Sequence, residues 1–277
     1  MTHAALLRMA RKTELDSEYA RSAARGAIPS LLGDASEQVL TALLENPHLD
    51  ETHLCLLLER EDLPQTILER IARRRQWLSH YPVKRRVAFH PHTPRLVAMR
   101  LARELFLMDL VQLSLFPSVP AELRRLAEEL ILGRLPQLPL GQKLTLARRG
   151  SARVAGGLVA EGHPQVVRIA LDNPLLTEAQ VLKVLSQEKL SATVVAAIAS
   201  HRKWSYPYNV RVALVRHPQT PLQRVLAFLP DLTLRDLSEL CEASTLTENL
   251  RQYLRHEITR RAERRSARNT AKGSHLG

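Results

Sequence analysis

The sequence predicts an all-α fold, a right-handed superhelical α-solenoid of about eight helical hairpins arranged as two tandem halves. Three observations lead to this prediction. Aromatic residues make up only 4% of the chain, and no period-two run of β-branched residues is bounded by turn residues, so signals for strands are nearly absent. The chain aligns with itself at a shift of 127 residues, and each half repeats again at a shorter period of about 40 residues.

The long repeat divides the chain. Residues 46–134 pair with 173–261 without a gap, with 27 identities in 89 positions. We therefore expect an N-terminal segment, a first solenoid half, a junction, a second half and a basic, flexible tail, at residues 1–16, 17–134, 135–143, 144–261 and 262–277. The final letters "KGSHLG" resemble an added tag and are set aside.

The short repeat defines the unit. Four phrases align on a proline, each with a valine eight residues earlier, and they read "VLTALLENPHLD", "VKRRVAFHPHTP", "VVRIALDNPLLT" and "VRVALVRHPQTP". A unit of about 40 residues is typical of two antiparallel helices that stack on their neighbours.

Each phrase predicts the end of one helix and the start of the next. In the last copy, apolar residues recur at helical spacing up to His217, and Pro218 then ends the helix. Thr220 is expected to cap the following helix, with Pro221 at its first position. Asp50 and Thr177 have the same expected role in other copies.

These phrases resemble the units of leucine-rich repeat variant proteins and, more broadly, HEAT and armadillo-like α-solenoids. The resemblance covers most of residues 17–261, but the unit is longer than in the variant family, and the cysteine cluster that binds an iron–sulfur centre there is missing. It therefore implies a repeat architecture and no metal site.

The bulk composition is that of a cytoplasmic protein without a membrane span. No apolar run approaches the roughly 20 residues that would cross a bilayer, and the N-terminal residues become charged too soon for a secretory signal. Cys55 and Cys241 stand alone in apolar helical contexts, which favours buried free thiols over metal ligands. We expect no cofactor, metal or membrane insertion, and the oligomeric state is not readable.

The charge suggests an anionic partner. The net charge is +12 and the pI is about 10.4, although 33 of the 40 basic residues are arginine, which a GC-rich genome would also produce. Residues 70–103 hold ten basic residues and no acid, and residues 200–230, at the same repeat position, hold five and none. The simpler interpretation is a solvated helix face. If the windows form a binding surface, its residues are Arg74, Arg75, Lys84, Arg86, Arg202, Lys203, Arg211 and Arg216.

Three repeated pairs could carry chemistry, and each has a structural explanation that we favour. His90 and His217 stand at helix C-termini, where imidazole can bond free carbonyls. Trp77 and Trp204 could anchor a partner or stack on a base, but their position favours a hairpin core. Asp109 and Asp236 are the only paired carboxylates, and Asp236 fits a capping box with Thr233.

The predicted function is a non-catalytic helical-repeat scaffold that binds an acidic protein or peptide on a basic surface. The first alternative is nucleic-acid binding through phosphate contacts. The second is an enzyme, a HEAT-like DNA glycosylase, for which Trp77 or Trp204 with Asp109 or Asp236 would have to supply the aromatic cleft and the acid. No glycine-rich phosphate loop and no nucleophilic triad can be proposed from the spacing.

Overall fold

A computed structural model describes residues 3–242 and 248–273 of the chain, with side chains for residues 12–242, 248 and 251–263. Every regular element in these ranges is an α-helix or a short 3-10 helix, and no strand occurs among them. The prediction of an all-α fold is confirmed. No described helix has the length and apolar character needed to span a membrane.

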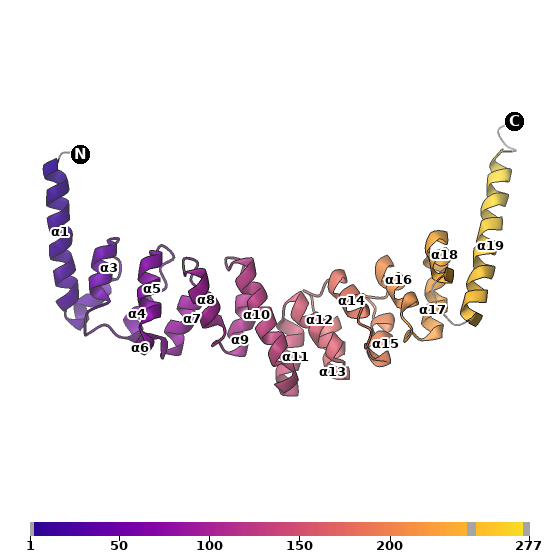
Figure 1. The fold of residues 1–277 in the computed structure, drawn as a ribbon, viewed down its shortest axis with the longest axis horizontal. Coiled ribbons are helices and arrows are strands. Elements are labelled where there is room, and N and C mark those ends of the chain that lie inside the picture. The colour runs from indigo at the N-terminus through magenta and orange to yellow at the C-terminus, as the bar shows by residue number, and fades with distance from the viewer. Residues whose placement is uncertain (1–2, 243–247, 274–277) are drawn as a thin grey trace. The chain divides into compact units, whose positions relative to one another are not determined.

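The chain divides into two compact units, Met1–Gly133 and Arg134–Gly277 (Figure 1). The division lies one residue before the end of the predicted first half. Within the predicted terminal segments, residues 3–16 belong to the first helix and residues 262–273 to the last one. The flexibility of the tail stays a prediction, and residues 274–277 lie outside the described residues.

The first unit is a row of short helices in two layers (Figure 1). Helix α1 packs on α3, α3 on α5 and α5 on α7, so alternate helices are neighbours, and α4 also packs on α7. The helices are α1 (His3–Ser22), η1 (Arg25–Ala27), α2 (Ile28–Leu31), α3 (Glu37–Leu43), α4 (Glu51–Leu57), α5 (Gln65–Arg73), α6 (Arg75–Leu78), α7 (Tyr81–Phe89), α8 (Arg95–Ala102), α9 (Leu107–Leu115) and α10 (Ala121–Arg134).

The second unit repeats this packing. Helix α11 contacts α13, α13 contacts α15, and α12 contacts α14, which contacts α16. The elements are η2 (Leu135–Gln137), α11 (Leu140–Arg149), α12 (Ala152–Glu161), α13 (Pro164–Leu171), α14 (Glu178–Leu185), α15 (Ala192–Ser200), α16 (Tyr208–Arg216), α17 (Leu222–Phe228), η3 (Leu229–Asp231), α18 (Leu234–Glu242) and α19 (Glu248–Gly273).

Apolar periodicity explains why these short helices form. Helix α5 buries Ile67, Leu68, Ile71 and Ala72, which recur at intervals of three and four residues and give the helix one apolar face. A helix of nine residues is marginal alone in water, so packing of this face against its neighbours supplies its stability.

The turns between helices are capped as predicted at Asp50 and Thr177, but not at Thr220. Asp50 and Thr177 are N-caps that accept hydrogen bonds from His53 N and Gln180 N. Thr220 is not a cap: α17 begins at Leu222, and the Thr220 hydroxyl donates instead to Leu214 O of the preceding helix at 2.5 Å. Thr93 donates in the same way to Val87 O at 2.6 Å, so this threonine closes one helix and does not open the next.

In each unit, a buried asparagine donates hydrogen bonds to backbone carbonyls at the end of a preceding helix. Asn46 Nδ2 donates to Ala20 O and Ala23 O, and Asn46 Oδ1 accepts from His48 N. Asn173 makes the corresponding three bonds, to carbonyls and an amide that each lie 127 positions further on. Because every polar atom of these amides is satisfied, burying them costs little.

Candidate partner-binding surface

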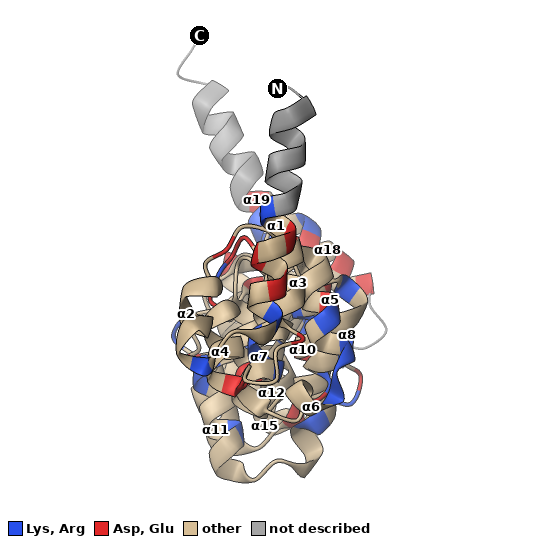
Figure 2. Cartoon of the chain, turned by 90° about the vertical axis from the view of Figure 1, so that its left-hand side faces the viewer, with Lys and Arg blue, Asp and Glu red and all other residues tan. Residues whose placement is uncertain are grey.

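The eight predicted basic residues occupy two kinds of place. Four lie where the chain turns after α5 or α15, which we call the α5–α6 corner (Arg74 and Arg75) and the α15–α16 turn (Arg202 and Lys203). The other four project from α7 and α16, namely Lys84, Arg86, Arg211 and Arg216. Figure 2 shows basic segments of the first unit beside the labels of α5, α6 and α8.

The cations on α7 are engaged in ion pairs. Lys84 Nζ lies 2.7 Å from Glu104 Oε2, and the lysine side chain is only 17% exposed. Arg86 Nη2 lies 3.0 Å from Glu59 Oε1. These carboxylates therefore neutralise the local charge and restrict the side chains that the sequence offered as partner contacts.

The cations on α16 are engaged as well. Arg211 donates to Ser205 O at 2.7 Å and pairs with Asp231, with its guanidinium over the ring of Tyr206. Arg216 pairs with Glu239 at 2.9 Å. The acids that pair with Lys84, Arg86, Arg211 and Arg216 all lie outside the acid-free windows, 20 to 27 residues away along the chain.

The arginines of the α5–α6 corner differ from the cations of α7 and α16 in the contacts that they make. Arg74 Nη1 donates to Leu44 O at 2.8 Å, and the guanidinium carbon lies 4.6 Å from the centre of the Trp77 ring system. Arg75 is exposed at the start of α6 and makes no ion pair within the described side chains. Arg70 and Arg73 lie in the last turn of α5, so four arginines gather at this end of the helix.

The α15–α16 turn has the same character. Lys203 Nζ lies 4.3 Å from the centre of the Trp204 ring system, a cation–π contact. Arg202 is exposed and, among the residues whose side chains are described, forms no ion pair. Arg202 stands 127 positions after Arg75, so one exposed cation occupies the same repeat position in each unit.

Both tryptophans belong to the core of these turns. Trp77 is 6% exposed and Trp204 is 3% exposed, and Trp204 Nε1 donates to Leu171 O at 2.8 Å. Their rings support the backbone beneath the cations and present no free face on which a base could stack.

The paired carboxylates are occupied by structural contacts. Asp109 accepts from Arg85 Nε at 2.6 Å and from the Tyr81 hydroxyl. Burial and the hydrogen bond to Asp109 raise the pKa of Tyr81 to about 12. Asp236 N donates to Thr233 Oγ1 at 3.2 Å, and hydrogen bonds from Thr233 and Tyr208 lower the pKa of Asp236. With Trp77 and Trp204 buried, the side chains named for a glycosylase are not assembled around a cleft.

His90 and His217 close the turns in which they lie. His90 Nδ1 accepts from His92 N at 3.2 Å, and His90 Nε2 bonds Arg60 O of the adjacent hairpin at 2.7 Å. His217 Nδ1 accepts from Gln219 N at 3.2 Å. Burial lowers the pKa of both imidazoles, so these contacts are made by the neutral ring.

No group of three metal-ligating side chains occurs in the part of the chain whose side chains are described. Cys55 and Cys241 are free and half-buried, where the sequence suggested full burial, and burial raises the pKa of both thiols.

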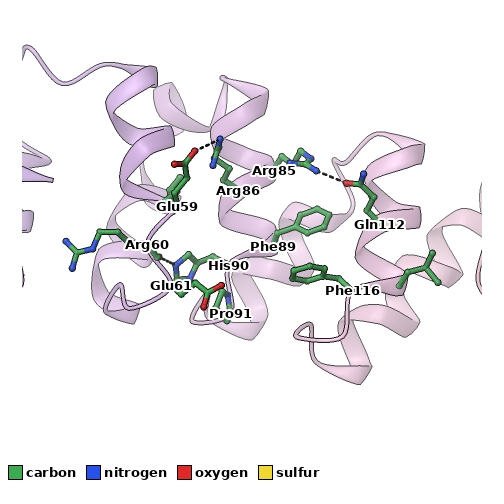
Figure 3. Close-up of a pocket in the computed structure, with 12 residues that line it drawn as sticks. Glu59, Arg60, Glu61, Arg85, Arg86, Phe89, His90, Pro91, Gln112 and Phe116 are labelled. Atoms are coloured by element: carbon green, nitrogen blue, oxygen red, sulfur yellow. Dashed lines mark hydrogen bonds and ion pairs between the residues drawn. The ribbon is translucent and has the colours of Figure 1, made fainter. Parts of the chain in front are cut away.

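A groove in the first unit was not predicted from the sequence. It is a cavity of about 550 Å³ between the end of α4, α7 and α9, and its apolar lining includes Leu58, Phe89 and Phe116 (Figure 3). A signal was available: the segment "LMDLVQLSLF" has Met108 and Leu115 where the aligned "LRDLSELCE" has Arg235 and Glu242.

Comparison with known protein families, with curated proteins and with solved structures finds no match to the chain, so what it does has to be argued from its own residues.

Proposed function

We propose that the chain is a non-catalytic helical-repeat scaffold that binds an acidic protein or peptide through the α5–α6 corner and the α15–α16 turn. The observation that supports this is the contrast among its cations. Arg75 and Arg202 are exposed and make no ion pair with described side chains, while Lys84, Arg86, Arg211 and Arg216 are paired with carboxylates. A cation with no internal partner is available to an external carboxylate without first breaking a contact.

The proposed architecture is a right-handed α-solenoid of about eight hairpins with two duplicated halves, 17–134 and 144–261. Repeated hydrogen bonds support it, in addition to the 127-residue alignment. Tyr81 bonds Asp109 and accepts from Phe106 N, and Tyr208 bonds Asp236 and accepts from Thr233 N. Arg75 and Arg202 occupy the same repeat position, so each is proposed to contribute a partner contact from its own unit.

A protein partner is favoured over nucleic acid by the number of available cations. Binding along a phosphate backbone uses many unpaired Lys or Arg residues, and each contact steepens the salt dependence of binding. Four of the eight predicted residues are already neutralised by an internal carboxylate. Two short clusters suit acidic side chains on a folded or extended protein better than a continuous polyanion.

The test compares three baits at low salt: the wild-type chain, the double variant Arg75→Glu/Arg202→Glu, and Lys183→Glu. Lys183 is an exposed cation on α14 outside both clusters, and it serves as the matched control. We expect the wild type and the control to recover the same acidic protein at stoichiometric yield, and the double variant to recover at least tenfold less.

A separate titration with labelled duplex and single-stranded DNA decides the alternative. Tight binding at about 50 mM salt, with affinity falling steeply as salt rises, would support nucleic-acid binding in its place. Equal recovery of the acidic protein by the double variant and the wild type would remove both clusters from the proposal.

A further inference from the structure

Helix α9 exposes large apolar residues on both sides of Gln112, in addition to the apolar residues that it buries. Leu110, Val111 and Leu113 lie in the core. On the opposite side, Met108 and Leu115 are exposed, and Phe116 follows directly after the helix with 45% of its surface exposed. Large apolar residues that gather on an exposed surface indicate an interaction surface.

The second unit shows that the fold does not require this face. At the aligned positions, Met108 is replaced by Arg235, Gln112 by Glu239 and Leu115 by Glu242. Phe89 on α7 is likewise replaced by Arg216 on α16. Arg216 and Arg235 both pair with Glu239, which makes a hydrated, ion-paired surface where the first unit has an apolar one.

The apolar residues of the first unit meet in the groove beside α9. Phe89 and Phe116 lie next to each other there, with ring centres 6.2 Å apart in an edge-to-face arrangement (Figure 3). Leu58 and Leu115 complete the apolar lining of the cavity of about 550 Å³. A volume of this size accommodates several bulky apolar groups.

Arginines from α7 form one edge of the groove. Arg85 donates to Asp109 at 2.6 Å and to Gln112 at 2.6 Å, and its guanidinium carbon lies 5.0 Å from the centre of the Phe89 ring. Those two bonds use Nε and Nη2, so Nη1 makes no hydrogen bond to the described residues. Arg86 binds Glu59 through Nη2 beside it. The donor that this edge offers next to the apolar floor is therefore Nη1 of Arg85, since Arg86 is already held by Glu59.

We propose that this groove binds an amphipathic helix of a partner protein, with Leu, Phe or Met anchors on one face and Asp or Glu residues beside them. The exposed positions 108, 112 and 115 repeat at helical spacing over about 10 Å, which suits anchors at i, i+3 or i+4, and i+7 on a second helix. An acidic residue of the partner would reach Nη1 of Arg85.

Charge decides between a partner and a second copy of the chain. Each copy carries a net charge of +12, so two copies repel where an acidic segment is attracted. Glu59 and Glu61 also line the cavity, so the available donor is Nη1 of Arg85 on the α7 side. The groove uses none of the residues of the α5–α6 corner or the α15–α16 turn, so this proposal stands or fails independently of the proposed function.

The experiment selects peptides from a displayed random 16-residue library on the full-length chain, with Leu115→Glu as the counter-selection target. Leu115→Glu and Met108→Arg install the residue types that the second unit carries at the aligned positions, and both sites are exposed. Leu96→Glu on α8 is the matched control, since Leu96 is 80% exposed and lies outside the groove. Circular dichroism and thermal unfolding establish that each variant is folded.

We expect enriched peptides to be acidic, with apolar residues at helical spacing. In fluorescence polarisation they should bind the wild type and Leu96→Glu equally, and Leu115→Glu at least tenfold more weakly. Met108→Arg changes the same exposed face of α9 outside the cavity lining, so it should weaken binding by a smaller factor. Enrichment of neutral or basic peptides, failure to enrich any peptide, or equal binding by all variants would overturn the proposal. So would sedimentation of a wild-type dimer that Leu115→Glu dissociates, because the groove would then belong to a second copy.

Discussion

The neutral imidazole of His90 bonds two backbone groups of the first unit through its two ring nitrogens. One ring nitrogen accepts from the amide of His92, and the other bonds the carbonyl of Arg60 in the preceding hairpin. Protonation would remove the lone pair that accepts from the amide, and the site is too buried for water to replace that bond readily. His217 makes the corresponding bond to Gln219 N in the second unit.

These two histidines predict a loss of stability in mild acid. Burial lowers the pKa of His90 and of His217, so the unfolded chain takes up protons at these sites before the folded chain does. Their contribution is complete above the ordinary histidine pKa of about 6.5 and is lost as the pH falls through that value toward the lower folded-state pKa. Melting temperature should therefore fall between pH 7.5 and pH 5.

The measurement is the slope of melting temperature against pH for the wild type and for His90→Gln/His217→Gln. We expect a flatter slope in the double variant, because its side chains do not titrate in this range. The control His48→Gln changes an exposed imidazole and should keep the wild-type slope. A double variant with the wild-type slope would show that other groups control acid stability.

At the scale of elements, ion pairs and carbonyl contacts link each helix to its neighbours. Arg211 on α16 bonds Ser205 O in the turn before its own helix, pairs with Asp231 of η3, and has its guanidinium carbon 5.9 Å from the centre of the Phe228 ring of α17. Its side chain is only 18% exposed. Arg202, in the adjoining turn, is exposed and forms no ion pair with described side chains.

Arg211→Ala should lower the free energy of unfolding by about 1–3 kcal/mol, because it leaves the half-buried carbonyl of Ser205 and the carboxylate of Asp231 without their donor. Arg202→Ala should change it by no more than about 0.5 kcal/mol, as is usual for an exposed side chain without contacts. Urea denaturation of the two variants beside the wild type measures both values. Equal effects of the two substitutions would contradict the division between structural and available cations.

The helical elements were largely predictable, because they are set by local signals. Proline after an apolar period ended helices, and Asp50 and Thr177 opened them as expected. Thr220 was assigned to the wrong helix because a hydroxyl can cap forward or bond backward, and spacing alone does not distinguish these bonds.

The candidate site was predictable only in part. The acid-free windows located the cations but not their partners, since Glu59 and Glu104 come from neighbouring hairpins. The groove depends on Leu58, Phe89 and Phe116 meeting across three elements, and that meeting is a property of packing. Only the apolar outer face of α9 was visible in the sequence, as a departure from the aligned helix of the second unit.

At the scale of the whole molecule, the net charge and the local charge carry different information. An internal ion pair removes one available cation and one acid, so pairing leaves the net charge of +12 unchanged while it reduces the binding surface. Much of the excess lies in α19, since residues 251–272 contain eight basic and two acidic residues. A long-range attraction for anions therefore coexists with short-range contacts confined to a few side chains.

Each unit has its own apolar core and its own set of repeated hydrogen bonds. Buried residues of the first unit include Leu40, Leu54 and Ile67, and those of the second include Val167 and Val181. Asn46 and Asn173 each satisfy two carbonyls within their own unit. A local defect in a repeat array acts first on its nearest neighbours, so damage to one unit should remain largely within that unit.

Asn46→Ala is therefore predicted to weaken the first unit selectively. It leaves the carbonyls of Ala20 and Ala23 without their donor, at a cost of about 1–3 kcal/mol. Hydrogen exchange read by mass spectrometry should show lost protection in α1, α3 and α4, and little change in α12–α16, where Asn173→Ala should produce the reciprocal pattern. Equal loss of protection in both units after either substitution would mean that the chain unfolds as one cooperative body, because the local cost would then be shared by every helix in the array.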